Sequence, residues 1–259
     1  MKDYGLVSII TPSWACGKFI GETIKSVQAQ TYQNWELLVQ DDCSTDNTRE
    51  VVAAFAQEDS RIKYECNPIN SGAAITRNNA LRRASGRWIA FLDSDDLWLP
   101  EKLERQLDFM VKNNYAFSYH KYAEMNENGT LNGITVSGIR KVSLWDFRCC
   151  NWVGCLTVMY NSQIVGLIQI KDIRSNNDTA MWLKVARVAP CYRLSENLAL
   201  YRRRQNGITP KPIMKKLKSH YNLFHYAEEM TPVQSVMFTI FSVAGHFIKK
   251  VLFVRKSKS

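Results

Sequence analysis

The chain has 259 residues, of which 46% are hydrophobic and 22% charged, and its net charge is +10. This composition excludes collagen-like, coiled-coil and disordered chains, and the length suffices to bury a core without disulfides. The positive excess lies in residues 200–259, where Glu228 and Glu229 are the only acidic residues, whereas residues 1–199 are neutral. A neutral body with a basic C-terminal segment indicates an anionic partner, either nucleic acid or acidic lipid.

Across the first hundred residues, short apolar runs alternate with segments of helical periodicity. Apolar runs typical of buried parallel strands occupy residues 6–11, 36–40, 62–66 and 88–92. Helices are predicted over residues 18–30, after the N-capping residues 44–46, over residues 70–84 and after Pro100. This rhythm predicts an α/β fold with a doubly wound, mostly parallel sheet, in which ligands bind at the carboxyl ends of the strands.

Beyond residue 113 the pattern weakens and fewer elements are predicted. They are short strands at residues 117–123 and 157–160, a helix over 178–187 and a longer helix over 232–254. The longer helix is apolar except for one polar stripe, which is formed by Ser235, Thr239, Ser242, His246, Lys249 and Lys250. We expect a basic amphipathic helix that contacts a membrane surface; packing on the body of the domain is the alternative.

Several features predict a cytoplasmic protein. There is no run of 18 apolar residues typical of a transmembrane helix, and the N-terminus lacks the apolar core of a signal peptide. The seven cysteines are odd in number and include no C-x-x-C pair, which favours reduced thiols. The basic segment lacks the interleaved aromatic residues of single-strand nucleic-acid grooves, so acidic lipid is favoured over nucleic acid.

Acidic residues follow two of the predicted strands. Asp93 and Asp95 flank Ser94 after the fourth strand, and such a D-x-D triplet fits Mg²⁺ or Mn²⁺ bound together with phosphate oxygens, although it also occurs as a helix cap. Asp42 follows the second strand and either caps a turn or accepts a hydrogen bond from a base or ribose. Trp14, just past the first strand, either stacks on a base or is a half-buried surface residue.

Six blocks of sequence match one family in order. They are residues 7–12 (VSIITP), 31–38 (TYQNWELL), 41–46 (DDCSTD), 77–80 (RNNA), 84–89 (ASGRWI) and 91–96 (FLDSDD). The chain resembles the family 2 glycosyltransferases of the GT-A fold, with high specificity over residues 6–112 and more loosely as far as residue 202. Within that family it is most similar to enzymes of bacterial surface polysaccharide assembly, such as those of teichuronic acid, capsule or lipopolysaccharide synthesis.

The resemblance implies a role for each residue of the donor site. It implies that the nucleotide sugar, most often a UDP-sugar, is bound by Thr11, Pro12, Trp14, Asp42, Arg77, Asp93 and Ser94. Asp42 would bond uracil, and Arg77 would lie near the ribose or diphosphate. Asp95, with Asp93, would hold Mn²⁺ or Mg²⁺.

The resemblance also implies how the acceptor reacts. Asp178 matches the general base of inverting members, and Trp182 would wall the acceptor site. The implied reaction moves the sugar to a hydroxyl of a lipid-linked or lipopolysaccharide-type glycan, at the inner face of the cytoplasmic membrane. The resemblance divides the chain into a GT-A domain, residues 1–205, and a basic helical extension, residues 206–259. The domain has a nucleotide-sugar half, 1–112, and an acceptor half, 113–205.

The sequence departs from the family pattern at three places. Trp14-Ala15 replaces the usual Tyr-Asn, and Asn177 replaces the Glu or Gln that precedes the base. Cys43 replaces a glycine, which predicts a negative φ at that position.

Two other classes of function stay open at this point. One is a sugar-1-phosphate nucleotidylyltransferase, although residues 11–18 contain a single glycine where a Gly-rich phosphate loop would be expected. The other is a non-catalytic module that binds nucleotide sugar or membrane, which would have no need of a base such as Asp178.

Overall fold

The computed structural model describes residues 2–204 and 212–256. Within them the strands form one 11-stranded mixed sheet. The strands are β1 (Val7–Ser13), β2 (Trp35–Asp41), β3 (Ile62–Cys66), β4 (Trp88–Phe91), β5 (Leu97–Trp98), β6 (Phe117–Asn126), β7 (Leu131–Val136), β8 (Lys141–Val142), β9 (Met159–Asn161), β10 (Cys191–Arg203) and β11 (Val254–Lys256). The α-helices are α1 (Ile20–Gln28), α2 (Thr48–Glu58), α3 (Ala73–Arg82), α4 (Lys102–Asn113), α5 (Leu144–Cys149), α6 (Ser162–Val165), α7 (Asn177–Ala186), α8 (Ile213–Asn222) and α9 (Pro232–Phe253).

The sheet has a parallel half and a mixed half. Strands β3, β2, β1 and β4 lie side by side and run parallel. Strand β9 then pairs antiparallel with both β4 and β6, and β6 pairs in parallel with β10. The carboxyl ends of β1, β2 and β4 therefore meet at one edge, as the sequence predicted.

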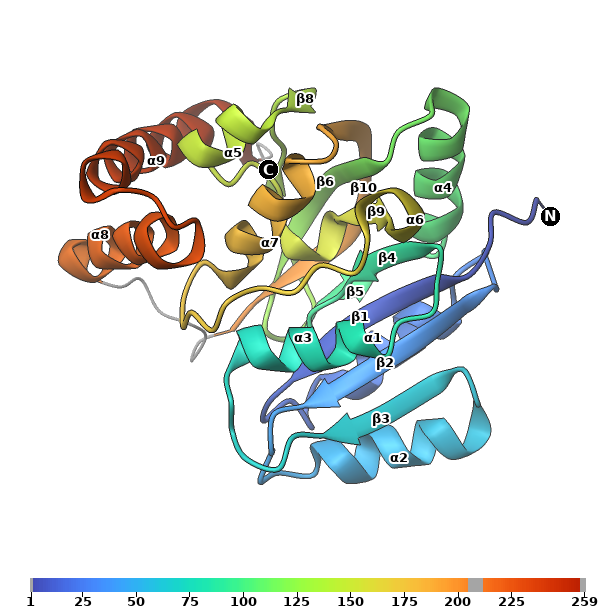
Figure 1. Ribbon diagram of the computed structural model, residues 1–259. Helices are drawn as coiled ribbons and strands as arrows, with labels where there is room; N and C mark the ends of the chain where they lie inside the picture. Colours follow the sequence, from blue (N-terminus) through green and yellow to red (C-terminus); the bar gives the residue numbers. More distant parts are fainter. Residues whose placement is uncertain (1, 205–211, 257–259) are drawn as a thin grey trace.

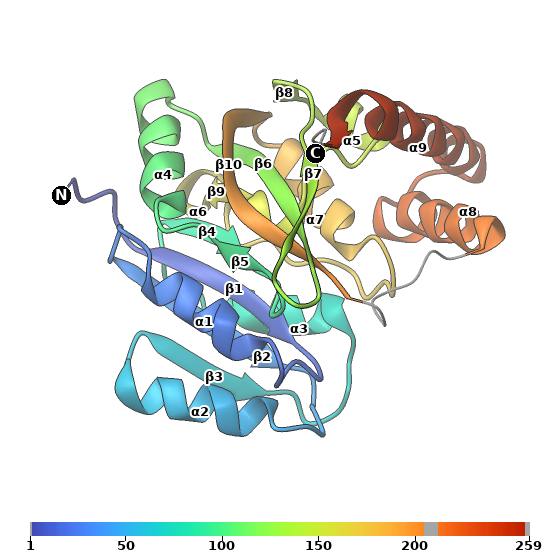
Figure 2. The ribbon, with the colours of Figure 1, turned by 180° about the vertical axis from the view of Figure 1, so that it is seen from behind.

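Helices cover both faces of the sheet (Figures 1 and 2). Because successive strand residues point to opposite faces, Ile9 and Ile10 of β1 enter different cores. Ile9 packs in a core shared with α1, α2 and α4, whereas Ile10 packs in a core shared with α3, α5 and α7. The predicted α/β class with a doubly wound, mostly parallel sheet is confirmed.

Strand β10 was not predicted, because its longest apolar run, LALY at residues 198–201, covers only four of its thirteen residues. Its side chains alternate irregularly between buried and half-exposed positions, and its pairing with β6 is interrupted by register shifts. All seven cysteines lie in described segments and are free thiols.

The C-terminal segment packs against the domain and extends its sheet. Helices α8 and α9 lie beside α5 at one end of the molecule, and β11 pairs antiparallel with β7 (Figures 1 and 2). A capping box formed by Thr231 and Gln234, with Pro232 in the first turn, starts α9. The predicted boundary at residue 205 lies outside the described residues.

The first half of the polar stripe of α9 faces the domain, whereas His246 and Lys250 near its end are exposed. Ser235, Thr239 and Ser242 are buried against the domain, whereas the apolar side chains of Val236, Ile240, Phe247 and Val251 are more than half exposed. A surface helix of a soluble domain normally has the opposite orientation.

By length and composition alone, α9 is also the one helix among the described residues that could cross a membrane. Its mean hydropathy is 1.5 over an 18-residue window of which 22% is buried. Interspersed Ser, Thr, Gly and His residues interrupt the apolar run, but the helix as a whole stays apolar. The lack of an uninterrupted run therefore does not exclude a spanning helix, contrary to the expectation from sequence.

Candidate active site

The candidate site lies where the carboxyl ends of β2 and β4 approach the first turns of α3 and α7. Asp42, directly after β2, is almost fully buried and accepts three hydrogen bonds. Its Oδ1 accepts from Asn67 Nδ2 at 2.9 Å and from the Ser71 backbone N–H at 2.7 Å, and its Oδ2 accepts from the Gly72 backbone N–H at 2.8 Å. Asp42 thus fixes the loop that leads into α3, and a carboxylate with four lone-pair sites retains acceptor capacity for one more donor.

The D-x-D residues are each paired with an arginine. Arg77 Nη2 on α3 lies 2.6 Å from Asp93 Oδ1, and Arg204 Nη1, just after β10, lies 3.4 Å from Asp95 Oδ2. Burial and the neighbouring charge of Asp93 raise the pKa of Asp95, and Arg204 acts in the opposite direction. Two carboxylates therefore share one partly desolvated site with positive charge on both sides.

Asp96 and Arg202 hold the D-x-D turn through hydrogen bonds. Asp96 is buried, its Oδ1 accepts from the Arg202 backbone N–H at 2.9 Å, and burial raises its pKa well above the ordinary value. Arg202 donates to the Asp95 carbonyl and forms a 2.6 Å ion pair with Glu22, its own side chain being 1% exposed. Arg202 is therefore a buried arginine whose partners hold the end of β10 against the D-x-D turn.

The donor set at Asp93 and Asp95 fits a divalent cation. In each carboxylate one oxygen accepts a hydrogen bond from an arginine. The second oxygen of each is the kind of ligand that Mg²⁺ and Mn²⁺ prefer. Within the described segments no group of three or more His, Cys, Asp or Glu side chains forms a complete metal cage. A cation here would be completed by phosphate oxygens and water, as is usual for Mg²⁺ with substrate phosphates.

Asp178 lies in the first turn of α7, where the helix dipole favours a negative charge. Its Oδ1 accepts from the Thr179 backbone N–H at 2.7 Å, and its Oδ2 accepts from Asn151 Nδ2 at 3.1 Å. The preceding Asn177 accepts a hydrogen bond from Arg77 Nη1. Arg77 therefore joins the D-x-D turn to the helix terminus that carries Asp178.

The residues predicted to bind the base lie at the end of β1. Trp14 is 58% exposed, which leaves a ring face available for stacking, whereas Thr11 is fully buried in the strand and Pro12 is half-buried. The buried hydroxyls of Thr11 and Ser13 make no hydrogen bond within residues 2–204 and 212–256. No contact with a nucleotide tests these predictions, and they stay predictions.

The prediction of a negative φ at Cys43 is wrong, because its φ is 61°. Asp41 accepts from both the backbone N–H and the hydroxyl of Ser44, at 3.0 and 2.5 Å, and this closes a tight turn around Cys43. Ala15 is also left-handed, with φ 48°, and its N–H donates to Ser44 Oγ at 2.9 Å. The hydrogen bond from Ala15 to Ser44 joins the turn at Ala15 to the turn at Cys43. It helps to hold both residues in the left-handed conformation, which costs a non-glycine residue about 1–2 kcal/mol.

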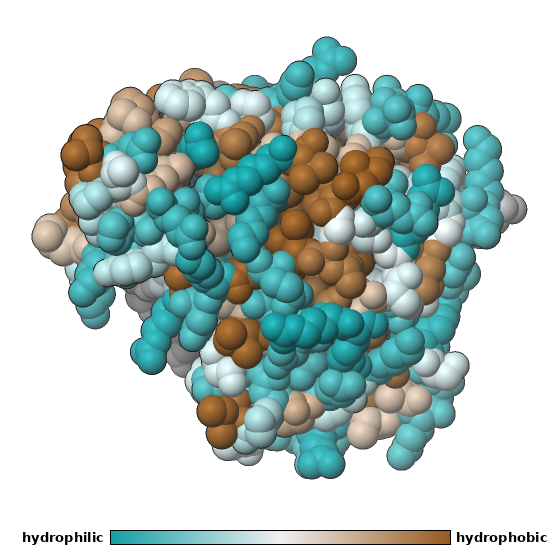
Figure 3. Space-filling view, in the orientation of Figure 1, coloured by the Kyte–Doolittle hydropathy of each residue, from teal (hydrophilic) through white to brown (hydrophobic). Residues whose placement is uncertain are grey.

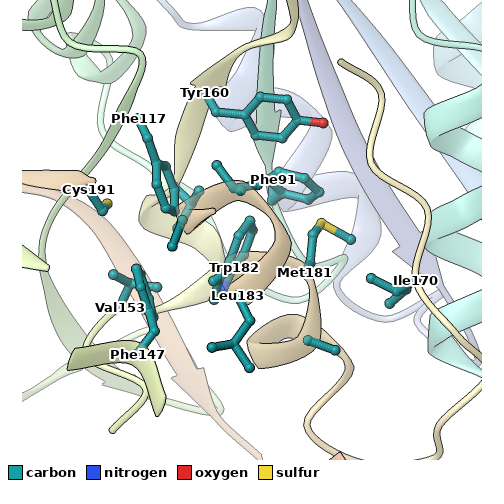
Figure 4. Close-up of a cluster of buried hydrophobic side chains, with 14 of the residues drawn as sticks. Phe91, Phe117, Phe147, Val153, Tyr160, Ile170, Met181, Trp182, Leu183 and Cys191 are labelled. Carbon is teal, nitrogen blue, oxygen red and sulfur yellow. The ribbon is translucent and has the colours of Figure 1, made fainter. Parts of the chain in front are cut away.

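The prediction that Trp182 walls an acceptor site is also wrong. Its side chain has no exposed surface and packs against Phe91, edge to face at 4.9 Å, and against Phe117 (Figure 4). Trp182 lies one turn after the half-buried Asp178 on α7, and the family resemblance implied that it lines the same site. The helix instead turns Trp182 into the core, where it supports α7 from beneath.

Two residues near Asp178 were not assigned to the site from sequence. Asn151, in the loop after α5, donates to Asp178, and Lys249 on α9 donates to the Asn151 carbonyl at 2.8 Å. Nothing in the local sequence around either residue indicates this contact, since 98 positions separate them.

Comparison with known proteins identifies the family. Residues 8–149 match the family described as "Glycosyl transferase family 2". A Bacillus subtilis relative, "Putative teichuronic acid biosynthesis glycosyltransferase TuaG", is 41% identical over 205 residues, which cover 79% of this chain and 81% of the relative. The Escherichia coli "UDP-Glc:alpha-D-GlcNAc-diphosphoundecaprenol beta-1,3-glucosyltransferase WfgD" is 43% identical over 185 residues, which cover 71% of each chain.

Solved structures agree on the fold. Residues 1–349 of S. aureus TarS, in complex with UDP-GlcNAc, superpose with a TM-score of 0.72 at 20% identity, over 93% of this chain and 72% of that TarS chain. The mannosyltransferase PcManGT from Pyrobaculum calidifontis, in complex with GDP-Man and Mn²⁺, gives a TM-score of 0.64 at 15% identity, over 96% and 76% of the two chains. At these identities the likeness shows the GT-A fold alone.

Proposed function

The chain belongs to glycosyl transferase family 2, and from that premise we propose that it transfers a sugar from a UDP-sugar to a hydroxyl of a growing cell-surface glycan, with inversion at the anomeric carbon. Membership of this family makes the chain a glycosyltransferase rather than a nucleotidylyltransferase or a non-catalytic module. The donor, the acceptor, the metal and the residue roles are the parts that we propose.

One observation carries the proposal. The buried guanidinium of Arg77 contacts both Asp93, in the D-x-D turn, and Asn177, beside Asp178. A transferase needs its diphosphate-binding groups and its base on either side of one anomeric carbon, held in fixed geometry. Arg77 supplies that fixed connection between the two halves of the site.

The choice of UDP rests on relatives. WfgD is named for UDP-Glc, and TarS has been crystallised with UDP-GlcNAc. PcManGT binds GDP-Man on the same fold, so the fold by itself does not select the base. We assign base contact to the exposed Trp14, with Pro12 and Thr11 behind it, and the uracil hydrogen bond to the remaining acceptor site of Asp42. Ser94, buried between the two carboxylates, completes the donor site.

Charge stabilisation at the leaving diphosphate is assigned to the D-x-D region. Asp95 and Asp93 would hold Mn²⁺ or Mg²⁺, which when bound supplies positive charge to the departing nucleoside diphosphate. Arg77 and Arg204 lie beside these carboxylates and are already oriented by them. Such preorganised charge costs no reorganisation as the bond breaks.

Asp178 is assigned the role of general base. It takes the proton of the acceptor hydroxyl as the oxygen attacks the anomeric carbon on the face opposite the diphosphate. The carbon–oxygen bond to the acceptor forms while the bond to the diphosphate breaks, so a single displacement inverts the configuration. Asn151 and the Thr179 N–H orient the carboxylate for this step.

The acceptor is proposed to be a lipid-linked or lipopolysaccharide-type glycan at the inner face of the cytoplasmic membrane. WfgD is named for α-D-GlcNAc-diphosphoundecaprenol. The outward apolar face of α9, with the lysines of α8 and the basic residues that follow α9, suits an anionic lipid surface (Figure 3). In this arrangement residues 1–205 form the catalytic domain and residues 206–259 its membrane-contacting extension, with no role for nucleic acid.

The proposal is tested by calorimetric titration of UDP, GDP and dTDP, each with Mn²⁺ and then with a chelator. We expect UDP alone to bind tightly, and only with the metal. Tighter binding of GDP or dTDP would overturn the donor assignment, and equal binding of UDP with the chelator would overturn the metal assignment.

A further inference from the structure

Helix α9 packs closely against residues 149–150 at Gly245. A Cβ atom added to Gly245 would lie 2.2 Å from the Cys149 carbonyl oxygen and 2.9 Å from Cys150 Cβ. Only a residue without a side chain allows this approach, which brings α9 onto the end of α5 and the loop that follows it. The adjacency of α5 and α9 is visible from both sides of the molecule (Figures 1 and 2).

One turn further along, Lys249 makes a specific contact with the same loop. Lys249 is half-buried, and its ammonium group donates to the Asn151 carbonyl at 2.8 Å. Burial lowers the pKa of Lys249, whereas Cys150 and Asp178 act in the opposite direction. The neighbouring Lys250 points into solvent, so the two lysines have different environments.

The loop is also held on its other side. Trp152 packs edge to face against Phe253 at 5.5 Å, and its indole N–H donates to the Asp146 carbonyl at 3.2 Å. Asn151 is therefore fixed between α5 and α9 through its backbone. Its side chain is left to reach Asp178, with Nδ2 donating to Asp178 Oδ2 at 3.1 Å.

We propose that Lys249 is a positioning residue for the base: it holds the backbone of Asn151, and the Asn151 side-chain amide in turn orients the Asp178 carboxylate. Helix α9 is then part of the acceptor side of the active site as well as an exposed apolar surface. This inference rests on the proposed role of Asp178 as general base.

The kinetic test compares Lys249→Met and Asn151→Ala with the control Lys250→Met, which removes the same charge one position away. The probes are UDP-glucose and α-D-GlcNAc-diphosphoundecaprenol. We expect Lys249→Met and Asn151→Ala each to lower kcat by up to about 10²-fold, since small misplacements of a catalytic group have effects of this size. The KM for UDP-glucose and the Kd for UDP should stay unchanged, and Lys249→Arg should recover part of kcat.

Combination with Asp178→Asn separates positioning from a general loss of structure. Once the base is gone its orientation no longer matters, so Lys249→Met should not reduce the residual transfer of Asp178→Asn. An equal reduction in both backgrounds would overturn the inference, as would a wild-type kcat in Lys249→Met and Asn151→Ala. Wild-type transfer by Asp178→Asn itself would overturn the proposed base and this inference with it.

A second measurement needs no substrate. Crystal structures of Lys249→Met and Lys250→Met report directly on the contact between Asn151 Nδ2 and Asp178 Oδ2. We expect the contact to be lost in Lys249→Met and retained in Lys250→Met. Retention in both variants would overturn the inference.

Discussion

Arg77 Nη2 lies 2.6 Å from Asp93 Oδ1, and the arginine side chain in this ion pair is only 9% exposed. Burial lowers the pKa of Arg77, but the negative charges of Asp93 and Asp178 act in the opposite direction, and the net effect is a raised pKa. The same guanidinium reaches Asn177, so a permanent cation connects β4, α3 and α7. The connection places the D-x-D carboxylates and Asp178 in one framework before any substrate binds.

Removal of this cation should affect both stability and transfer. Arg77→Met leaves a partly buried carboxylate without its donor, and we expect a loss of about 1–3 kcal/mol in the free energy of unfolding. The control Arg105→Met breaks an exposed pair with Glu101 and should cost about 0–1 kcal/mol. Urea denaturation measures both values, and equal effects would contradict the structural role of Arg77.

Asp95→Asn should remove the metal dependence of UDP binding. The amide keeps the shape of the side chain but lacks the charge that a hard divalent cation requires. We expect the Kd for UDP with Mn²⁺ to rise to the value measured with a chelator. Asp108→Asn, the same change on the surface helix α4, should leave the Kd unaltered; a metal-dependent Kd that persists in Asp95→Asn would count against Asp95 as a ligand.

Phe247→Glu should release the protein from anionic lipid. Phe247 is 70% exposed on the outward face of α9, so the change does not disturb the core. Flotation with vesicles that contain phosphatidylglycerol measures the bound fraction, which we expect to fall while UDP binding is retained. Val111→Glu places the same charge on an exposed apolar position of α4 and should stay bound; unchanged flotation of Phe247→Glu would refute the membrane contact.

The buried His120 should make stability fall at acidic pH. Burial, with a smaller contribution from Lys102, lowers the pKa of His120 to about 3. The unfolded chain therefore binds a proton on this side chain below about pH 6.5, where the folded protein does not, and stability is lost as the pH falls from there towards 3. His120→Gln should flatten this dependence between pH 7.5 and 5, as measured by urea denaturation, whereas His225→Gln should not. The same slope in both variants would exclude His120 as its source.

Residues close together in sequence were predicted well. The apolar runs that became β2 and β4 are followed by Asp42 and Asp93, and the parallel sheet places both carboxylates at the same edge. Trp182 was expected at the acceptor site because it is close to Asp178 in the sequence. That closeness does not show how α7 is rotated about its axis, and the rotation places Trp182 against Phe91 in the core. The left-handed φ of Cys43 depends on hydrogen bonds from Ser44 to Asp41. The replacement of the family's glycine by Cys43 does not by itself reveal those hydrogen bonds.

Contacts between distant segments could not be predicted. Lys249 belongs to the polar stripe of a helix that was expected to contact a membrane surface, with packing on the domain as the alternative. Ser235, Thr239 and Ser242 of that stripe face the domain, and Gly245 allows a close approach to Cys149. The contact from Lys249 to Asn151 follows from this tertiary packing and from no local pattern.

The most direct test of the account is transfer by Asp178→Asn, measured together with UDP binding on the same preparation. The substituted amide keeps the size of the side chain but cannot take up the proton of the acceptor hydroxyl. We expect the Kd for UDP in the presence of Mn²⁺ to equal that of the wild type, and transfer to fall by about 10²–10⁴-fold, the usual contribution of a general base. Transfer at the wild-type rate would contradict the assignment of Asp178 and, with it, the proposed mechanism.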